Sequence, residues 1–244
     1  CLLTAPGARE IVETIADGLM AQHAELAGVY WGITEALADV ALPQELLLLR
    51  GEPFLKERVG EFVLQLHPFN FLQPNLAQAE RLYATVMEWL APSPQGVAWD
   101  VYCGVGTIGL YLSRRFGRVY GIDSEASNME AARRNAELNG VSNISFHAGR
   151  TEAVLADKRF WLLEAKPDAV VVDPPRAGLH RQVIGALLGA RPTQLVYISC
   201  NPQALARDLE ILLRGFPRYA IRRVAAFDLF PQTPHIETAV LLQR

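Results

Sequence analysis

The sequence predicts an α/β fold with a mostly parallel sheet of seven strands, preceded by a smaller α+β unit. From about residue 94 onward, short apolar runs rich in Val, Ile and Tyr alternate with helical segments, which indicates βα units around a parallel sheet. The last two runs follow one another without an intervening helix, so we expect them to form an antiparallel pair. The predicted strands are 96–102, 118–123, 143–148, 168–173, 193–199, 219–230 and 235–244.

Helical segments separate most of these strands. A glycine-rich turn leads into a helix at about Thr107, and a second helix is predicted within 124–140, with Ser124 as its N-cap and Gly140 as its stop. Before the first strand of the sheet, residues 75–90 place apolar side chains on one helical face. A Pro-containing stretch then ends this helix.

Residues 1–66 have a different pattern. An amphipathic helix near 8–27 is followed by short strands and turns, without the regular alternation of strand and helix. We therefore predict two domains, a small α+β unit at 1–66 and a larger α/β domain at 67–244.

Composition narrows the class of protein. The 244 residues are 50% hydrophobic and 20% charged, which predicts a globular protein. Three cysteines predict neither a disulfide framework nor a four-cysteine metal or iron–sulfur site, and they favour a reducing compartment. No apolar run could span a bilayer and no signal peptide is visible, so we expect no membrane partner and a cytoplasmic location. The net charge of −3 does not favour a large nucleic-acid-binding face.

The stretch DVYCGVGTIG places Gly104, Gly106 and Gly109 in a G-x-G-x-x-G pattern between a strand and a helix. Glycines let a ligand approach the backbone closely, and a helix N-terminus offers unpaired N–H groups. Asp123 ends the next strand, where an acid commonly binds the two hydroxyls of a ribose. The pattern fits a dinucleotide or S-adenosylmethionine, and it also fits a tight turn that needs only small residues.

Asp173 and Cys200 end two further strands. Asp173 is followed by two prolines that stiffen its loop, and ligands of parallel sheets bind at the carboxyl ends of strands. Cys200 stands between its strand and a helix that starts near Gln203. A cysteine at this position is either inert packing or a thiolate stabilised by the helix dipole.

Glu237 and His235 precede the last strand in an otherwise apolar segment. A carboxylate here could act as a base if the fold brings it beside Cys200. A solvated strand end is the alternative interpretation of Glu237, and we expect a structural role for His235.

Taken together, five stretches resemble the RNA uracil-5-methyltransferase family, whose members modify tRNA and 23S rRNA. They occur in the family's order and cover about residues 51–244. The SCNP stretch with ARDL behind it, and the FP-x-T-x-H-x-E stretch, are specific signals, whereas the glycine loop is not. The five stretches are FNFLQPN, DVYCGVGTIGL, VVVDPPRAGL, VYISCNPQALARDL and FDLFPQTPHIETAVLL.

The resemblance implies a Rossmann-like, seven-stranded fold that uses S-adenosylmethionine, and it assigns roles by position. Cys200 matches the nucleophile that adds to carbon 6 of uracil, and Glu237 matches the base that removes the proton from carbon 5. Thr107 stands where some members have asparagine, and Arg150 stands where an acid or amide often lies near the adenine. The implied cofactor contacts are Gln73, Tyr102, Gly104, Gly106, Thr107, Asp123 and Asp173.

The implied partner is RNA, with rRNA favoured over tRNA, and the implied reaction is methylation of carbon 5 of a uridine. The family often carries an N-terminal OB-like RNA-binding domain, and some members carry an iron–sulfur site; we expect neither in these residues. A basic surface could lie in such a missing part. Near the active edge, the candidate phosphate contacts, each also explained as solvated surface, are Arg176, His180, Arg181 and Arg207.

Other classes remain open. An RNA cytosine-5-methyltransferase would usually carry a second cysteine in the loop after Asp173, and an amine methyltransferase would carry an aromatic residue where Arg176 stands. A nicotinamide-dependent oxidoreductase would share the glycine loop but would leave SCNP unexplained. An inactive cofactor- or RNA-binding fragment would have no reason to keep Cys200 and Glu237 together.

Overall fold

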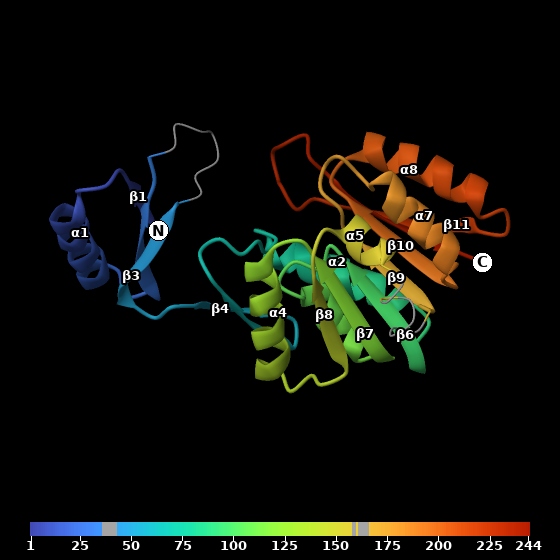
Figure 1. Ribbon diagram of the computed structural model, residues 1–244, viewed down its shortest axis with the longest axis horizontal. Coiled ribbons are helices and arrows are strands. Elements are labelled where there is room, and N and C mark those ends of the chain that lie inside the picture. The colour runs from blue at the N-terminus through green and yellow to red at the C-terminus, as the bar shows by residue number, and fades with distance from the viewer. Residues whose placement is uncertain (36–42, 158–159, 161–165) are drawn as a thin grey trace. The chain divides into compact units, whose positions relative to one another are not determined.

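The computed structural model contains two compact units (Figure 1). The first comprises Cys1–Glu57 with Gln65–Phe69, and the second comprises Arg58–Leu64 with Asn70–Arg244. A single cut at residue 66, as the sequence suggested, therefore does not describe how the chain is divided between these units. The structure describes residues 1–35, 43–157, 160 and 166–244.

The small unit is a three-stranded sheet with one helix, in the order β1-β2-β3. The helix is shorter than the predicted 8–27, because the chain turns extended at His23 and must then reach the start of the second strand. Gly28 begins that strand so close to the Glu52 carbonyl that a Cβ would lie 2.4 Å from it. The elements are β1 (Leu2–Thr4), α1 (Arg9–Gln22), β2 (Gly28–Ile33) and β3 (Glu45–Gly51).

A hairpin of β4 (Leu55–Val59) and β5 (Phe62–Leu66) follows, and its tip belongs to the large unit. The ring of Phe62 meets Tyr111 edge-on at 5.0 Å between centroids, and the Tyr111 hydroxyl donates to the Val59 carbonyl. Asn139 pairs with the backbone of Val63 through both its amide nitrogen and its oxygen. These contacts fix the hairpin tip to the helices of the large unit.

The large unit contains a seven-stranded sheet in the order β11-β12-β10-β9-β6-β7-β8. Five strands are parallel, and β12 runs antiparallel to both of its neighbours, which confirms the predicted fold class and the antiparallel ending. The strands are β6 (Ser93–Val101), β7 (Phe116–Asp123), β8 (Ile144–Ala148), β9 (Ala169–Val172), β10 (Gln194–Ser199), β11 (Ala220–Phe227) and β12 (Glu237–Gln243).

The sheet has a switch point between β6 and β9. After β6, the next strands in the chain, β7 and β8, are added on one side of it in the sheet. β9 lies on the other side of β6, and β10 is added beyond β9. Since parallel crossovers are right-handed, the helices of the two halves cover opposite faces, and ligands of such sheets bind where the winding reverses. Figure 1 shows α5, α7 and α8 together on one face. The helices are α2 (Leu76–Trp89), α3 (Thr107–Ser113), α4 (Ala126–Leu138), α5 (Thr151–Ala156), α7 (Arg181–Ala190) and α8 (Pro202–Gly215).

One predicted cap is wrong. We expected Ser124 to cap the helix after β7, but α4 begins at Ala126, with Glu125 at the N-cap position and no side-chain cap. The preceding residue, Asp123, takes over the local hydrogen bonding by accepting from the Glu125 amide at 2.9 Å. The Asp123 carboxylate, at the end of β7, therefore accepts from the backbone near the start of α4, where we had expected the Ser124 side chain to do so. Within the described residues, no helix has the length and apolar content needed to cross a bilayer.

Candidate active site

The register of β10 and β12 brings the two candidate catalytic residues face to face. Ser199 of β10 pairs with Thr238 of β12 in the antiparallel ladder. The ladder ends at this pair, and Cys200 and Glu237 are the next residue along each segment. They are near enough for the charge of Glu237 to raise the pKa of the Cys200 thiol. The fold therefore places a thiol and a carboxyl group side by side, although they are 37 residues apart in the sequence.

Asp173 reaches the same place from the other neighbour of β10. β9 runs parallel to β10, with Val172 beside Tyr197, so the residue after β9 lies at the end of β10. The charge of Asp173 raises the pKa of both Cys200 and Glu237. Three predicted site residues thus share one small volume at the carboxyl edge of the sheet.

Burial gives both carboxyl groups unusual pKa values. Glu237 is only 3% exposed, and burial, assisted by the charge of Asp173, raises its pKa to about 8. Burial alone raises the pKa of Asp173 to about 7. A carboxylate with a pKa in this range is a far stronger base than an ordinary one, and it can still be deprotonated near neutral pH. The arrangement can therefore accept a proton from a weak carbon acid.

The Cys200 thiol lies in a mixed electrostatic environment. Burial and the negative charge of Glu237 raise its pKa, whereas a hydrogen bond from the Arg176 guanidinium and its positive charge oppose the rise. The sequence suggested that the start of the following helix would stabilise the thiolate, but the net shift is upward. Arg176 is thus the cation that favours the reactive form of the sulfur.

Asn201 explains why the helix start does so little for the thiolate. Its side-chain oxygen accepts from the amides of Gln203 and Ala204 at 3.1 and 3.3 Å, so the first turn of α8 is already capped. Its side-chain nitrogen donates to the Arg176 carbonyl at 2.9 Å. One residue therefore caps the helix behind Cys200 and fixes the loop that carries Arg176.

His235 stands next to this loop. Its Nε2 lies 3.4 Å from Nη2 of Arg176, and its ring meets Phe230 edge-on at 6.2 Å between centroids. The sequence suggested a structural role for His235 and a phosphate contact for Arg176. The position of Arg176 between the thiol and this imidazole was not visible in the strand pattern, because the two partners come from different segments.

A buried carboxylate holds the loop after β9 against α8. Asp208 accepts at 2.7 Å from both the Leu179 amide and the Tyr197 hydroxyl, and its other oxygen lies 2.8 Å from Arg207. Arg207 also donates to the Ala177 carbonyl at 2.8 Å. Arg207 thus has a structural use that the sequence, which suggested a phosphate contact, did not reveal. In the ARDL stretch, Arg207 and Asp208 thus hold the loop after β9 against α8.

The glycines of the loop after β6 have different tasks. Gly104 has φ +52°, and a Cβ there would meet nothing within 4 Å, so this part of the loop borders open space. Gly106 has φ +85°, and a Cβ there would lie 3.1 Å from Ala132 and Phe146. The Gly104 amide already donates to Asp123 at 2.9 Å, so it is not a free donor as the motif suggested. Gly104 therefore borders space that a ligand could enter, whereas Gly106 serves packing.

Asp123 and Gln73 provide acceptors at this loop. Asp123 is held by the Gly104 and Glu125 amides, and Asn128 donates to it at 3.3 Å, which leaves lone pairs for two ribose hydroxyls. Oε1 of Gln73 is buried and accepts no hydrogen bond within the described residues. An unpaired buried acceptor is costly unless a ligand donates to it, so these residues fit a bound nucleoside. Thr107, also buried, opens α3 directly behind the loop.

Tyr102, a predicted cofactor contact, and Arg150 have well-defined neighbours. Tyr102 has φ +66°, and its half-buried ring packs against the core and borders an open pocket of about 620 Å³. His180 and Arg181 line the same pocket, on the side of the loop that follows Asp173. Arg150 is paired with Glu152 at 2.5 Å, so an acid two residues later neutralises the unexpected charge. In the part of the chain that the structure describes, no group of His, Cys, Asp and Glu side chains has metal-binding geometry.

Comparison with known families agrees with this geometry. A family model described as tRNA (uracil-5-)-methyltransferase matches residues 55–244. The chain belongs to this family. An RNA methyltransferase of Listeria innocua, described as uncharacterized, is 39% identical over 240 residues, which are 98% of this chain and 50% of the relative.

Solved structures give the same assignment. The tRNA (uracil-54, C5)-methyltransferase of Pyrococcus abyssi, in complex with S-adenosyl-L-homocysteine, is 34% identical with a TM-score of 0.74. The match covers 91% of this chain and 52% of that structure. Trm5b of Pyrococcus abyssi, at 15% identity and a TM-score of 0.63, shares the fold. The chain spans about half the length of the curated relatives that it matches.

Proposed function

We propose that this protein methylates carbon 5 of a uridine in RNA, with S-adenosylmethionine as the methyl donor. The observation that carries the proposal is the proximity of Cys200, Glu237 and Asp173 at the end of the β10–β12 ladder. Membership of the uracil-5-methyltransferase family supports the choice of base and of position.

Cys200 begins the proposed reaction. Carbon 5 of uracil is a poor nucleophile, and addition of the thiolate to carbon 6 moves the electron pair of the C5–C6 double bond onto carbon 5 and oxygen 4. The hydrogen bond and positive charge of Arg176 oppose the rise in the pKa of the thiol and so favour its thiolate form. The cofactor, when bound, supplies an electrophilic methyl group on a sulfonium sulfur.

Glu237 completes the proposed reaction. After carbon 5 has gained the methyl group, it still carries its hydrogen. The Glu237 carboxylate removes that proton, the double bond re-forms and the Cys200 thiolate leaves carbon 6. A pKa of about 8 suits this step, because the base must be strong and yet available at physiological pH.

The proposed cofactor contacts divide into two groups. Asp123 would bind the ribose hydroxyls, and Gln73 would receive a donor at its unpaired oxygen. Gly104, Thr107 and Asp173 would border the cofactor, while Gly106 shapes the loop. Tyr102, whose half-buried ring borders the pocket that His180 and Arg181 line, is the remaining proposed contact.

The RNA substrate is proposed from a relative. The Pyrococcus abyssi relative acts on uridine 54 of tRNA according to its description, so tRNA is the first RNA to test. The preference for rRNA and the cytoplasmic location remain predictions from the sequence. The target base must leave its stack to reach Cys200, as in other enzymes that modify bases.

The test is identification of the product nucleoside. Purified protein is incubated with S-adenosylmethionine and unmodified tRNA or 23S rRNA transcripts, and the digested RNA is analysed by mass spectrometry. We expect 5-methyluridine, formed by wild type and by Cys1→Ala but not by Cys200→Ala. Formation of 5-methylcytidine or of an N-methylated base would overturn the proposal in favour of another methyltransferase class.

A further inference from the structure

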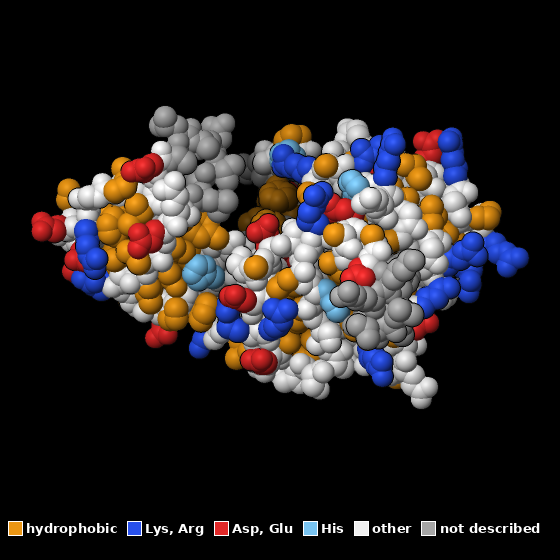
Figure 2. Space-filling model, in the orientation of Figure 1, with side chains coloured by type: hydrophobic (Ala, Val, Ile, Leu, Met, Phe, Trp, Pro, Cys, Tyr) orange, Lys and Arg blue, Asp and Glu red, His pale blue; other side chains and the backbone are white. Residues whose placement is uncertain are grey.

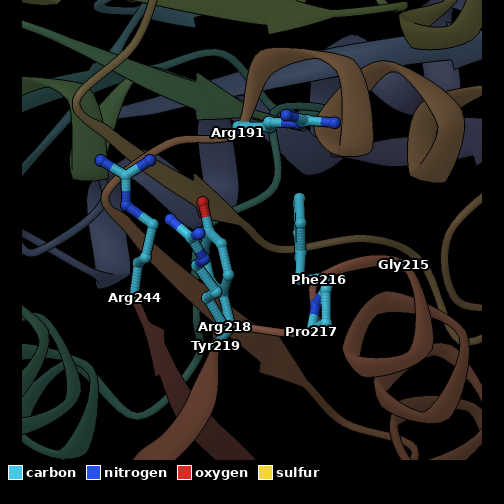
Figure 3. A pocket seen from close by; sticks show the side chains of 7 residues that line it. All are labelled: Arg191, Gly215, Phe216, Pro217, Arg218, Tyr219 and Arg244. Carbon is cyan, nitrogen blue, oxygen red and sulfur yellow. The ribbon is translucent and has the colours of Figure 1, made fainter.

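We propose that a pocket at the opposite edge of the sheet binds a phosphate group of the substrate RNA's backbone. This arginine pocket is an open hollow of about 350 Å³ (Figure 3). The inference rests on the proposed function, because it takes RNA as the substrate. The residues lining the pocket are Arg191, Gly215, Phe216, Pro217, Arg218, Tyr219 and Arg244.

The fold gathers the three arginines from distant places. Arg191 follows α7 in a left-handed conformation with φ +49°, Arg218 lies between α8 and β11, and Arg244 follows β12. β12 is antiparallel to β10, so its end lies beside the start of β10. All three cations therefore meet at the amino edge of the parallel strands, and Figure 3 shows their guanidinium groups around the Tyr219 hydroxyl.

None of these guanidinium groups is neutralised within the described residues. The side chains of Arg191, Arg218 and Arg244 make no hydrogen bond or ion pair there, and no acidic residue lines the pocket. By contrast, Arg214 on the neighbouring helix pairs with Glu210 at 2.5 Å. Three unpaired guanidinium groups around one hollow form a site for an oxyanion, since Arg matches phosphate oxygens in a bidentate manner.

The electrostatic field in the pocket is positive where a ligand would sit. Burial raises the pKa of Tyr219, and the charges of Arg244 and Arg191 oppose that rise. The Tyr219 hydroxyl is fixed by donation to the Pro192 carbonyl. A fixed phenol beside three arginine side chains suits a group that carries negative charge on its outer oxygens.

The aromatic pair in the pocket argues for phosphate rather than for a base. Phe216 and Tyr219 stack on each other at 4.1 Å between ring centroids, with 20° between planes. They are 2% and 9% exposed, so neither ring offers a free face on which a base could stack. Recognition at this pocket therefore depends on charge and is independent of RNA sequence.

The distribution of charge along the chain fits this assignment. The whole chain has a net charge of −3, yet residues 191–244 contain seven arginines against four carboxylates. Arg222 and Arg223, exposed on the edge strand β11, extend the positive surface beyond the pocket. Figure 2 shows basic side chains projecting from the margin of the large unit near the C-terminus.

The distance to the catalytic edge suits an RNA. Arg191 and Cys200 lie beyond opposite ends of β10, and the six residues of this strand alone span roughly 20 Å at about 3.3 Å per residue. One phosphodiester cannot reach both places, but a folded RNA that presents a flipped uridine at Cys200 extends far enough to contact both. The arginine pocket would then contribute affinity without touching the reacting base.

The test compares two triple variants in RNA binding. Arg191→Gln with Arg218→Gln and Arg244→Gln removes the pocket, and Arg9→Gln with Arg50→Gln and Arg214→Gln removes the same charge from ion-paired positions. Dissociation constants for the tRNA and rRNA transcripts are measured between 50 and 200 mM salt. We expect the pocket variant to bind about tenfold or more weakly, with a salt slope reduced by about 2–3, and the control to change little.

The outcomes separate this inference from the proposed function. Equal dissociation constants and slopes for the two triple variants would overturn the inference, as would binding of inorganic phosphate at the pocket with RNA affinity unchanged in the pocket variant. At saturating RNA, the pocket variant should retain the wild-type kcat. Loss of RNA affinity in the pocket variant, with no methylation by wild type, would support the inference while the proposed function fails.

Discussion

The two edges of the seven-stranded sheet carry opposite kinds of polar group. At the carboxyl edge, Cys200, Glu237 and Asp173 are crowded together, and burial shifts their pKa values upward. At the amino edge, Arg191, Arg218 and Arg244 surround an open pocket, and within the described residues their side chains have no partners. Bond-making chemistry requires desolvated groups whose proton affinities are altered, whereas attraction of a polyanion requires only exposed charge.

The two edges also differ in the hydrogen bonds that hold their side chains in place. The catalytic edge is supported by the buried Asp208 network and by the Asn201 cap. The arginine pocket has a rigid floor, but among the described residues no polar network orients its cations. Changes at the catalytic edge should therefore alter rates and stability strongly, and changes at the other edge should alter affinity alone.

The largest expected effect is loss of the nucleophile. Cys200→Ala should lower methyl transfer to RNA by about 10⁴-fold or more, because Cys103, the other described thiol at this edge, is buried and burial raises its pKa well above the ordinary value. Cys1→Ala, which removes an exposed thiol from the small unit, should leave the rate unchanged. Initial rates of methyl incorporation measure both, and substantial activity in Cys200→Ala would remove the thiol from the mechanism.

Loss of the base should be the next largest effect. Glu237→Gln should reduce kcat by about 10²–10⁴-fold while still allowing the thiolate to add to uracil. A covalent protein–RNA species should then accumulate and be visible on a denaturing gel. A slow variant without any such species would place Glu237 before adduct formation.

The supporting network should affect stability more than chemistry. Asp208→Asn leaves Arg207 and the loop after β9 poorly paired, so the free energy of unfolding should fall by about 2–4 kcal/mol. Glu210→Gln, an exposed carboxylate on the same helix, should cost less than about 0.5 kcal/mol. Urea denaturation of the two variants distinguishes a buried network from a surface pair.

The raised pKa of Glu237 predicts how stability depends on pH. Between its ordinary value of 4.5 and its folded value of about 8, the folded state binds more protons than the unfolded state, so this group's contribution to stability falls as pH rises through that window. Glu237→Gln removes the dependence. Relative to wild type, the free energy of unfolding of the variant should rise by about 3–4 kcal/mol between pH 5 and pH 8.5. A relative fall over the same range would show that Glu237 is already ionised at low pH.

The same carboxylate sets the pH dependence of the rate. Glu237 acts as a base only when deprotonated, so kcat should rise with pH up to about 8. Because burial also raises the pKa of the Cys200 thiol, kcat should continue to rise above that pH. A profile already flat from pH 5.5 would mean that an ordinary carboxylate is the base.

The smallest expected effect belongs to the arginine pocket. Arg218→Gln should change the free energy of unfolding by less than about 0.5 kcal/mol, because its guanidinium has no partner within the described residues. Thermal unfolding checks this value. A large loss of stability would make Arg218 a structural residue and would end the contrast between the two edges.

The candidate residues at the carboxyl edge could be grouped from the sequence because they lie at the ends of strands. Parallel strands bring such ends together whatever their separation, so Asp123, Asp173 and Cys200 could be grouped from the strand pattern alone. The exact partner of Cys200 depended on a register that periodicity does not reveal. The upward shift of its pKa likewise comes from β12, and no local pattern contains that information.

The arginine pocket could not be predicted in the same way. Arg191, Arg218 and Arg244 are separated by 26 or more residues and share no motif. Only the antiparallel return of β12 brings the last of them beside the first. The Asp208 network was not predicted for a related reason. A carboxylate on a helix is expected to be solvated, and the sequence does not show that Asp208 is buried.

The most direct measurement uses RNA with 5-fluorouridine at the target position. Fluorine cannot leave as a proton does, so addition of Cys200 and methylation should stop at a stable adduct. Intact mass of wild type incubated with this RNA and S-adenosylmethionine should show the protein plus methylated RNA, whereas Cys200→Ala should show the protein alone. A methylated product without any adduct, or an adduct that persists in Cys200→Ala, would contradict the central claim that the Cys200 thiolate is the nucleophile.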